Sequence, residues 1–330
     1  MHNSLILKNI YLIAVFAFVV VVVGAFVRLT NAGLGCPDWP GCYGKPTPAH
    51  AAVEIAKAVE VQGGTHGPVS SQKAWHEMVH RYLAGTLGLL ILASTIAAWI
   101  KRRERVLATV LLALVVFQAA LGMWTVTLLL KPVIVTLHLL GGMATLALLT
   151  WLAARQRVWP QLPSPAAPIR PWVALGLALL IAQIALGGWV STNYAALACI
   201  DLPTCHGEWM PRMDFQHGFQ LLRELGQTAA GDKLSYDALT AIHWTHRVGA
   251  VVVTAYLAVL AFSLRRVIEL KNIALTMAAL LALQVTLGVA NILTGLKLHV
   301  AVAHNAGAAL LLVTLVVLNF ALSRGPGTRD

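Results

Sequence analysis

Four histidines with matched spacing are the side chains of this sequence best suited to chemistry. His80 and His246 are separated by the same number of residues as His138 and His304. His138 and His304 lie within long uncharged apolar runs, whereas the other two lie at the edges of such runs. Ionisable side chains within a membrane segment are costly and usually line a functional site. A single one is more commonly a buried hydrogen-bonding group, but two repeated pairs predict ligation of a metal or a haem iron.

Haem iron suits these histidines better than a bare metal ion does. Two imidazoles that face each other across a four-helix bundle can serve as the two axial ligands of one haem. Zinc and copper sites usually recruit further ligands nearby, and no Cys or Met is repeated with these histidines inside the apolar runs. We therefore predict that His80 pairs with His138 in the N-terminal half. His246 then pairs with His304 in the C-terminal half.

The residues beside two of these histidines differ between the halves. Glu77 lies three residues before His80, on the same face of a helix, and its counterpart in the second half is His243. Electron transfer has no need of a carboxylate, whereas proton transfer or substrate orientation does. We therefore expect chemistry in the N-terminal half and an electron-transferring haem in the C-terminal half. Arg81 and Arg247 directly follow the two histidines, where they could bind haem propionates or extend to the membrane surface.

The four cysteines form two Cys-x5-Cys motifs, which are also repeated. Cys36 and Cys42 lie in one long loop, and Cys199 and Cys205 lie in another. In an oxidising compartment such pairs form disulfides, which could be redox-active or could simply staple the loop. The alternative is a zinc site that includes His206, the residue after Cys205.

The elements that must position these residues are membrane-spanning helices. The chain has 330 residues, of which 58% are hydrophobic and 11% charged. A soluble domain of this size cannot bury so much apolar surface, whereas a lipid bilayer accommodates it in helices or a closed barrel. The apolar runs are long and unbroken rather than alternating, which favours helices. The formal net charge of +11 comes from basic residues between these runs, a membrane-topology pattern, so nucleic acid is not an expected partner.

Eight runs free of Asp, Glu, Lys and Arg are each long enough to cross a bilayer. The first is expected to be a retained helix rather than a cleaved signal peptide. The predicted spans are Ile10–Val27, Tyr82–Ile100, Val106–Leu130, Pro132–Ala154, Pro171–Thr192, Val248–Leu264, Asn272–Leu296 and Leu298–Ser323.

The distribution of basic residues predicts the orientation of these spans. Short basic loops follow the second, fourth and sixth spans, and further arginines follow the last. By the positive-inside rule this side, which also holds both termini, faces the cytoplasm of a bacterium. The long loops at 31–75 and 193–241 are then extracytoplasmic. We predict that residues 1–157 form one four-helix unit, 158–171 a cytoplasmic linker, and 172–330 a second four-helix unit.

An internal repeat relates the two units. Gln118 and Gly122 match Gln284 and Gly288 at the spacing that also relates the histidine pairs. Because four helices separate the repeats, both have the same topology, which predicts a pseudo-twofold axis along the membrane normal. The predicted fold is therefore an all-α integral membrane protein of eight transmembrane helices, arranged as two pseudo-twofold-related four-helix bundles.

Taken together, these motifs resemble those of the haem A synthase family over essentially the whole chain. The matching motifs are Arg28-Leu-Thr-Asn-Ala-Gly, Cys36-Pro-Asp-Trp-Pro-Gly-Cys42, Glu77-Met-Val-His80-Arg81, His138, His246-Arg247 and His304. The resemblance implies a membrane oxidoreductase that oxidises the C8 methyl group of haem O to a formyl group. Successive hydroxylations of that methyl group would give haem A for terminal oxidases.

The resemblance also implies where each part of this activity lies. It places a haem b cofactor in the C-terminal unit, substrate haem beside an essential acidic residue in the N-terminal unit, and a disulfide in each long loop. The implied residues are His246 and His304 for haem b, His80 and His138 for substrate haem, Glu77 for catalysis, and Cys36–Cys42 and Cys199–Cys205 for the disulfides. The motifs leave the roles of His76 and His243 open.

Implied partners are haem O, membrane lipid, a haem O synthase (a farnesyltransferase), oxidase assembly factors and further copies of this chain. Two other functions fit part of the pattern. A bis-histidine membrane cytochrome would hold two equivalent haems for electron transfer and would not need Glu77. A haem transporter can also be built from parallel repeats, and it would have few fixed ligands.

Overall fold

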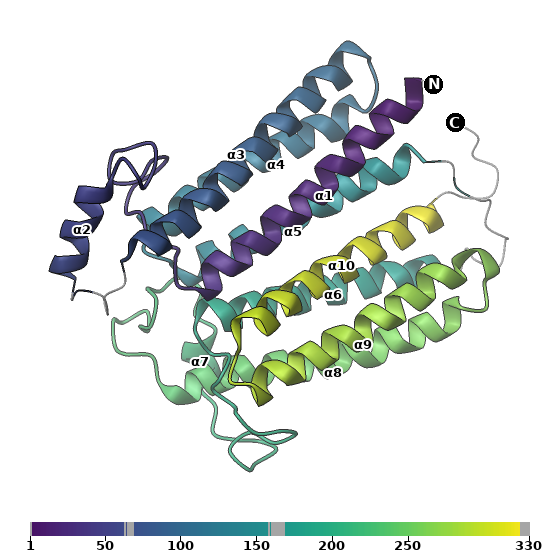
Figure 1. Ribbon diagram of the computed structural model, residues 1–330. Helices are drawn as coiled ribbons and strands as arrows, with labels where there is room; N and C mark the ends of the chain where they lie inside the picture. The colour runs from purple at the N-terminus through teal and green to yellow at the C-terminus, as the bar shows by residue number, and fades with distance from the viewer. Residues whose placement is uncertain (1, 63, 65–68, 158, 160–168, 324–330) are drawn as a thin grey trace.

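The structure, a computed structural model, describes residues 2–62, 64, 69–157, 159 and 169–323. Within these residues all regular secondary structure is helical (Figure 1), which confirms the predicted fold class. The long helices are α1 (His2–Leu29), α3 (Ser71–Ile100), α4 (Arg105–Thr127), α5 (Pro132–Arg155), α6 (Arg170–Thr192), α8 (Tyr236–Leu264), α9 (Lys271–Leu293) and α10 (Leu298–Ser323). The short ones are α2 (Ala52–Val61), α7 (Phe215–Gly218) and the 3-10 helix η3 (Ile268–Leu270).

Eight helices in the described part of the chain are long and apolar enough to cross a membrane, as predicted. The predicted spans differ from them mainly at the starts of α3 and α8, which begin about three turns earlier than expected. Ser70 and Ser235 cap these two helices, and their hydroxyl oxygens accept the backbone N–H of Lys73 and Ala238. The predicted spans stopped at charged residues. The helices continue past them because charged side chains such as Glu77, Arg81 and Arg247 form hydrogen bonds with the adjoining loops.

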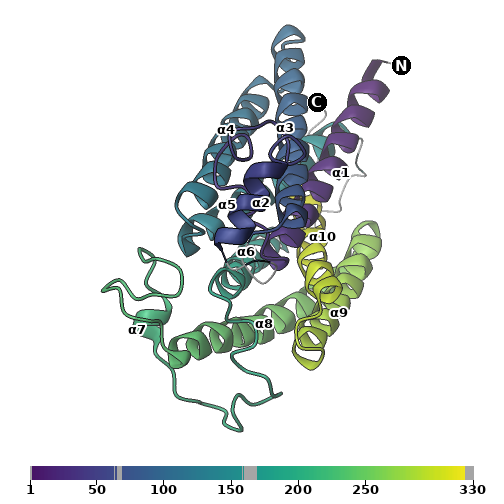
Figure 2. The same cartoon turned by 60° about the vertical axis from the view of Figure 1, so that its left-hand side comes forward.

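The long helices of the described residues form two groups of four, and the two groups lie side by side in Figures 1 and 2. In the N-terminal half α1 and α4 each pack against α3 and α5, and in the C-terminal half α6 and α9 each pack against α8 and α10. The halves meet through α1–α10, α5–α6 and α5–α10. In chain order, α1 matches α6, α3 matches α8, α4 matches α9 and α5 matches α10. Under this matching the α1–α10 contact corresponds to the α5–α6 contact, and the α5–α10 contact corresponds to itself. This is the packing that a twofold relation between the bundles predicts.

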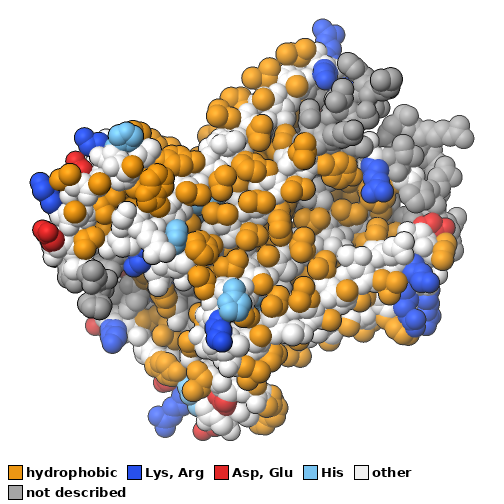
Figure 3. All heavy atoms as spheres, viewed as in Figure 1, with side chains coloured by type: hydrophobic (Ala, Val, Ile, Leu, Met, Phe, Trp, Pro, Cys, Tyr) orange, Lys and Arg blue, Asp and Glu red, His pale blue; other side chains and the backbone are white. Residues whose placement is uncertain are grey.

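Apolar side chains cover the outside of the bundles as well as filling the core. Leu12 and Val251 are 67% and 70% exposed, whereas Ile91 and Leu257 are fully buried in a cluster that includes residues of both halves. In Figure 3 hydrophobic side chains cover the middle of the visible face, and Lys and Arg lie toward its ends. An apolar outer surface of this extent fits a multi-pass membrane protein, whose exposed side chains contact lipid.

The two long loops lie at the opposite end of the molecule from the start of α1 and the end of α10 (Figure 1). The first membrane-spanning helix therefore starts, and the last one ends, at the same end of the molecule, as an even number of spans requires. Because α3 and α8 start early, the loops are shorter than predicted and end at Ser70 and Ser235. In the predicted linker at 158–171, residues 158 and 160–168 lie outside the described residues.

Candidate functional site

The structure brings His80 on α3 and His138 on α5 together inside the N-terminal bundle. Their ring centroids are 6.4 Å apart, and the ring planes are nearly perpendicular at 89°. A ligating imidazole nitrogen lies about 2 Å from its metal, so two rings on opposite sides of one iron have centres roughly 6 Å apart. The observed separation therefore suits a shared iron.

His246 on α8 and His304 on α10 occupy the matching helices of the C-terminal bundle. Both helices pack against α6 and α9. Gln183 on α6 places its amide nitrogen 3.0 Å from Nδ1 and 2.9 Å from the backbone oxygen of His246. On α9, the amide nitrogen of Gln284 lies 3.4 Å from Nε2 of His304.

Each of the four imidazoles lies against a glycine of a neighbouring helix. A Cβ atom built on the glycine would lie only 2.9–3.1 Å from Cε1 of the histidine ring, so any side chain there would require the ring to move. The pairs are Gly24 with His80, Gly122 with His138, Gly187 with His246 and Gly288 with His304. At all four positions the missing side chain of a glycine therefore leaves space for the imidazole ring.

Several ring nitrogens at these positions have no protein partner. Nδ1 of His80, His138 and His304 is buried without a hydrogen bond among the described residues. Buried polar atoms are normally satisfied, so such a cluster indicates a binding site rather than a packed core. Paired, uncharged nitrogen donors inside an apolar bundle are the donor set of a bis-histidine haem, and the residues present therefore fit that group.

Glu77 lies one turn before His80 and is only 4% exposed. Its Oε2 accepts the backbone N–H of Cys36 at 2.9 Å, and its Oε1 accepts a hydrogen bond from Arg81. Arg81 also donates to the carbonyl oxygens of Asp38 at 2.7 Å and Gly41 at 2.6 Å. The carboxylate and the guanidinium together hold residues 36–42, which we name the first cysteine loop, against the end of α3.

The C-terminal half holds its own loop in the same way. Nδ1 of His243 accepts the backbone N–H of Cys199 at 3.2 Å. Arg247 donates to the carbonyl oxygens of Cys199 at 2.6 Å and of Asp201 and Thr204 at 2.9 Å each. We name residues 199–205 the second cysteine loop. His243, whose role the motifs left open, thus does for this loop what Glu77 does for the first.

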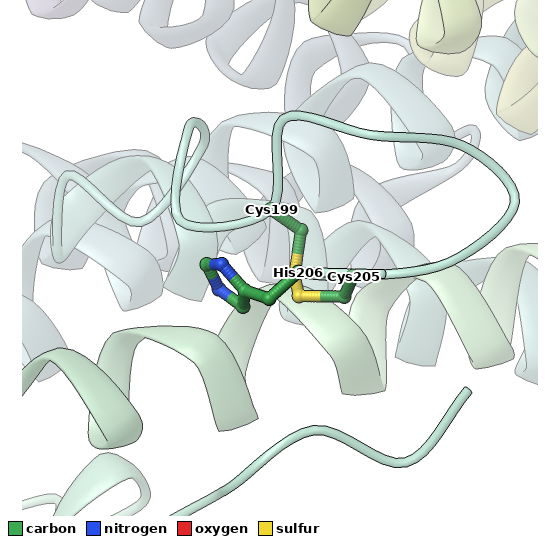
Figure 4. A group of neighbouring side chains, drawn as sticks. All are labelled: Cys199, Cys205 and His206. Carbon is green, nitrogen blue, oxygen red and sulfur yellow. A yellow bond between two sulfur atoms is a disulfide. The ribbon is translucent and has the colours of Figure 1, made fainter. Parts of the chain in front are cut away.

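Both cysteine pairs form disulfides, Cys36–Cys42 and Cys199–Cys205, as predicted. His206 lies close to the second pair, with its ring beside the two sulfur atoms (Figure 4). Zinc binds cysteine as the thiolate, and a disulfide sulfur is not one. The alternative of a zinc site at these three residues is therefore wrong for the structure observed.

The loops carry their own internal hydrogen bonds outside the membrane-spanning helices. The carboxylate of Asp38 accepts the N–H groups of Tyr43 at 2.6 Å and Gly44 at 2.7 Å. In the second loop Asp201 accepts the Thr204 hydroxyl and the N–H groups of the two residues that follow Cys205. These donors hold the pKa of Asp201 well below its usual range, because they stabilise the charged carboxylate.

Sequence reasoning missed two features of the site. One is the binding of Arg81 and Arg247 to the cysteine loops, which neither the propionate nor the surface prediction anticipated; propionate binding stays a prediction. The other is Arg28, which donates to the carbonyl oxygen of Ser191 at 2.6 Å and lies 4.2 Å from the Tyr194 ring. Arg28 and Ser191 have the same spacing as the cysteine pairs, so they are equivalent positions of the two repeats, but this spacing did not signal that the two positions meet.

Residues 8–316 of the chain match the family model described as cytochrome oxidase assembly protein, COX15-CtaA. A protein named heme A synthase from Shewanella oneidensis is 42% identical over 315 residues, which cover 93% of this chain and 94% of that protein. Proteins of the same name from Halalkalibacterium halodurans and Rhizorhabdus wittichii are each 28% identical. The aligned regions cover 98% and 99% of the two chains for the former, and 92% and 90% for the latter. The chain belongs to the haem A synthase family of cytochrome oxidase assembly proteins.

Proposed function

We propose that this protein is a haem A synthase, which oxidises the C8 methyl group of haem O to a formyl group and supplies haem A to terminal oxidases. The observation that carries the proposal is the pairing of His80 with His138 at an iron-spanning distance beside a buried carboxylate. Two hydroxylations of the methyl carbon, each a two-electron oxidation by an oxidant supplied from outside the protein, give a geminal diol, which loses water to leave the formyl group. The reaction makes the protein an oxidoreductase.

The two bundles have different tasks in this proposal. The N-terminal unit, residues 1–157, binds substrate haem O through His80 and His138. The C-terminal unit, residues 172–330, binds haem b through His246 and His304. Haem b, when bound, supplies one-electron transfer. The support for this division is that only the N-terminal pair has a carboxylate next to it, whereas the matching residue of the C-terminal unit is an imidazole.

Glu77 is the proposed catalytic residue. Its carboxylate is buried, lies on the helix that carries His80, and is fixed in direction by Arg81 and the Cys36 N–H. A carboxylate held in this way can take up or return a proton at an oxygen atom while the methyl carbon is oxidised. The same contacts hold the first cysteine loop against the end of α3.

Arg81 and Arg247 remain the proposed partners of the haem propionates. Their Nη atoms are engaged by the loops, but Nε of Arg247 is buried without a partner among the described residues. A propionate oxygen would satisfy that donor with a charge-assisted hydrogen bond.

We place the cysteine loops and both haem sites on the extracytoplasmic side of a bacterial cytoplasmic membrane, with both termini in the cytoplasm. The support is the set of basic loops at the opposite end from the disulfides. Haem O would arrive through the lipid or from a haem O synthase, and haem A would leave to oxidase assembly factors. Further copies of this chain are a candidate partner in the membrane.

Conversion of haem O tests the proposal directly. Purified protein is incubated with haem O and a reductant in air, and the extracted pigments are analysed by mass spectrometry. A haem whose methyl group has become a formyl group is the expected product. Unchanged haem O with two spectrally equivalent bound haems would instead indicate an electron-transferring cytochrome. Unchanged haem O that moves across a vesicle membrane would indicate a transporter.

A further inference from the structure

A groove of about 800 Å³ lies on the outside of the C-terminal bundle, between α8 and α9. Its floor is buried, with Ala274 1% and Ala261 5% exposed, whereas Leu275 and Phe262 on its rim are 51% and 53% exposed. The groove therefore opens toward the surrounding lipid. Arg265, at the end of α8 opposite the disulfide loops, also lines it, and the other lining residues among those described are uncharged.

The matching helices of the N-terminal bundle, α3 and α4, are joined directly in the corresponding region. The Thr95 hydroxyl lies 3.1 Å from a backbone carbonyl oxygen of α4, and the Trp99 indole N–H donates to a threonine hydroxyl of α4 at 3.0 Å. At the spacing that relates the histidines, α8 has Ala261 and Arg265 at these two positions, and the threonine is replaced by Leu275. Neither contact can therefore form between α8 and α9.

Three alanines widen the middle of the groove. At the matching positions the N-terminal half has larger side chains. The pairs are Ala258 and Leu92, Ala278 and Leu112, and Ala282 and Val116. At the end of the groove away from Arg265 the sizes are reversed, because Thr254 and Val285 match Gly88 and Ala119. The additional space in the C-terminal half thus lies between the middle of the groove and its arginine.

The length of the groove matches one leaflet of a bilayer. Thr254 and Arg265 are eleven residues apart on α8, which is about 16 Å along a helix. Half of a hydrocarbon core of roughly 30 Å is about 15 Å. A groove that begins at the membrane surface beside Arg265 therefore ends near the middle of the bilayer.

The surface end of the groove is basic. Arg265 and Arg266 both lie over the Phe262 ring, with Cζ 4.0 Å and 5.4 Å from its centroid. Neither guanidinium forms an ion pair with a residue that the structure describes. Lys271 at the start of α9 adds a third positive charge, against one negative charge at Glu269. Two unpaired guanidinium groups beside an open apolar groove favour a ligand that is both anionic and apolar.

We propose that this groove binds an anionic phospholipid, with one acyl chain between α8 and α9 and the phosphate on Arg265 and Arg266. Basic pockets between transmembrane helices are known to bind such head groups. A helix of another protein would fill the apolar part of the groove but would leave both arginines without a counter-ion. The inference goes beyond the proposed function and does not depend on haem chemistry.

Bound lipid would take the place of the direct contacts that join α3 to α4. It would pack α9 against α8 at the end of the bundle where these helices lack polar contacts of their own. Because α9 also carries Gln284, whose amide nitrogen lies 3.4 Å from Nε2 of His304, the lipid would steady a helix of the C-terminal histidine site.

Lipid titration of the purified full chain tests the head-group half of the proposal. Phosphatidylglycerol or phosphatidylcholine with the same acyl chains is added in detergent, and bound lipid is counted by native mass spectrometry. Wild type should bind one phosphatidylglycerol about fivefold or more tightly than phosphatidylcholine. Arg265→Gln with Arg266→Gln should weaken phosphatidylglycerol binding about fivefold for each arginine removed. Lys101→Gln, a matched control at the same end of the N-terminal bundle, should change neither affinity.

Filling the groove tests the acyl-chain half. Ala278→Leu introduces the residue that the N-terminal half has at the matching position, and it should remove one bound lipid of either kind. Ala279→Leu adds the same bulk to an exposed neighbour outside the groove and should remove none. The C-terminal haem spectrum reports folding in each variant, and the arginine double variant decides the question if Ala278→Leu does not fold.

Two results would overturn the inference. One is phosphatidylglycerol binding that is the same as wild type in the arginine double variant and in Ala278→Leu. The other is an Ala278→Leu protein that changes its oligomeric state without losing a lipid, because a helix of a second copy would then occupy the groove. Neither result bears on the conversion of haem O, which is measured separately.

Discussion

Exchanging Glu77 for histidine separates the two roles that its position allows. Glu77 accepts the Cys36 N–H at 2.9 Å and a hydrogen bond from Arg81. The matching residue, His243, accepts the Cys199 N–H through Nδ1 at 3.2 Å. A histidine at position 77 can therefore keep the bond to the first cysteine loop while it removes the carboxylate. We predict that Glu77→His leaves the first cysteine loop anchored to α3 and stops haem A formation.

The two contacts set the expected magnitudes. The lost bond to Arg81 is charge-assisted and worth about 1.5–3 kcal/mol. Arg81 retains the carbonyl oxygens of Asp38 and Gly41 as acceptors, so the loss in stability should fall near the lower end of that range. Removal of a catalytic acid or base typically costs about 10²–10⁴-fold in rate. The effect on turnover should therefore far exceed the effect on folding.

Haem A formed from haem O per unit time is the primary measurement, made by pigment extraction and mass spectrometry. Thiol labelling reports whether the first disulfide is intact, and the reduced-minus-oxidised spectrum reports the C-terminal haem. Glu77→Gln, which keeps the shape of the side chain but cannot take up a proton, should lose turnover equally with an unchanged haem spectrum. Wild-type haem A formation by Glu77→Gln would refute the catalytic role and leave Glu77 as a loop anchor only, whereas activity in Glu77→His alone would show that an imidazole can replace the carboxylate in proton transfer.

Three further predictions concern the other parts of the site. Gly187→Ala places a Cβ 3.0 Å from Cε1 of His246, so the ring must move, and we expect purified protein to lose most of its C-terminal haem in a haem-to-protein assay. Arg247→Ala removes three hydrogen bonds to the second cysteine loop, and its disulfide should be reduced faster by dithiothreitol while that of the first loop is unaffected. The folded-state pKa of Asp201 is lowered, so its stabilising effect is present at neutral pH and is lost as the pH falls through that lowered value. Asp201→Asn should therefore unfold at a lower temperature than wild type at pH 7, and the difference should shrink on acidification.

The transmembrane helices could be predicted from the sequence because hydrocarbon selects for long uncharged runs. The same criterion failed where a helix continues past the membrane into the loops. In α3 the predicted span begins only after Arg81, because Glu77 and Arg81 are charged. Both side chains nevertheless point to the first cysteine loop and form hydrogen bonds with it. A hydropathy criterion treats each charge as exposed to lipid and cannot recognise a partner that comes from some forty residues away.

The histidine pairs could be predicted because duplication doubles every signal and a shared spacing is improbable by chance. The roles of Arg81 and Arg247 could not, since they depend on carbonyl groups that any residue type provides. Backbone acceptors have no sequence signature, so only the folded loop shows that these guanidinium groups are largely engaged. His243 became intelligible for the same reason, through the N–H of Cys199.

A duplicated bundle starts with two equal sites, and the proposed function requires two unequal ones. The structure keeps equal what both sites need, namely the paired imidazoles, the glycines under their rings and the anchored disulfide loops. The halves differ at Glu77 and His243, which places a carboxylate in the first half where the second has an imidazole, and at Val20 and Gln183, of which only the glutamine can hydrogen-bond a histidine. Glu77 and His243 lie on α3 and α8, whereas Val20 and Gln183 lie on α1 and α6. In the proposed function, a few substitutions on two pairs of matched helices therefore suffice to make one bundle a reaction site and the other a holder of its cofactor.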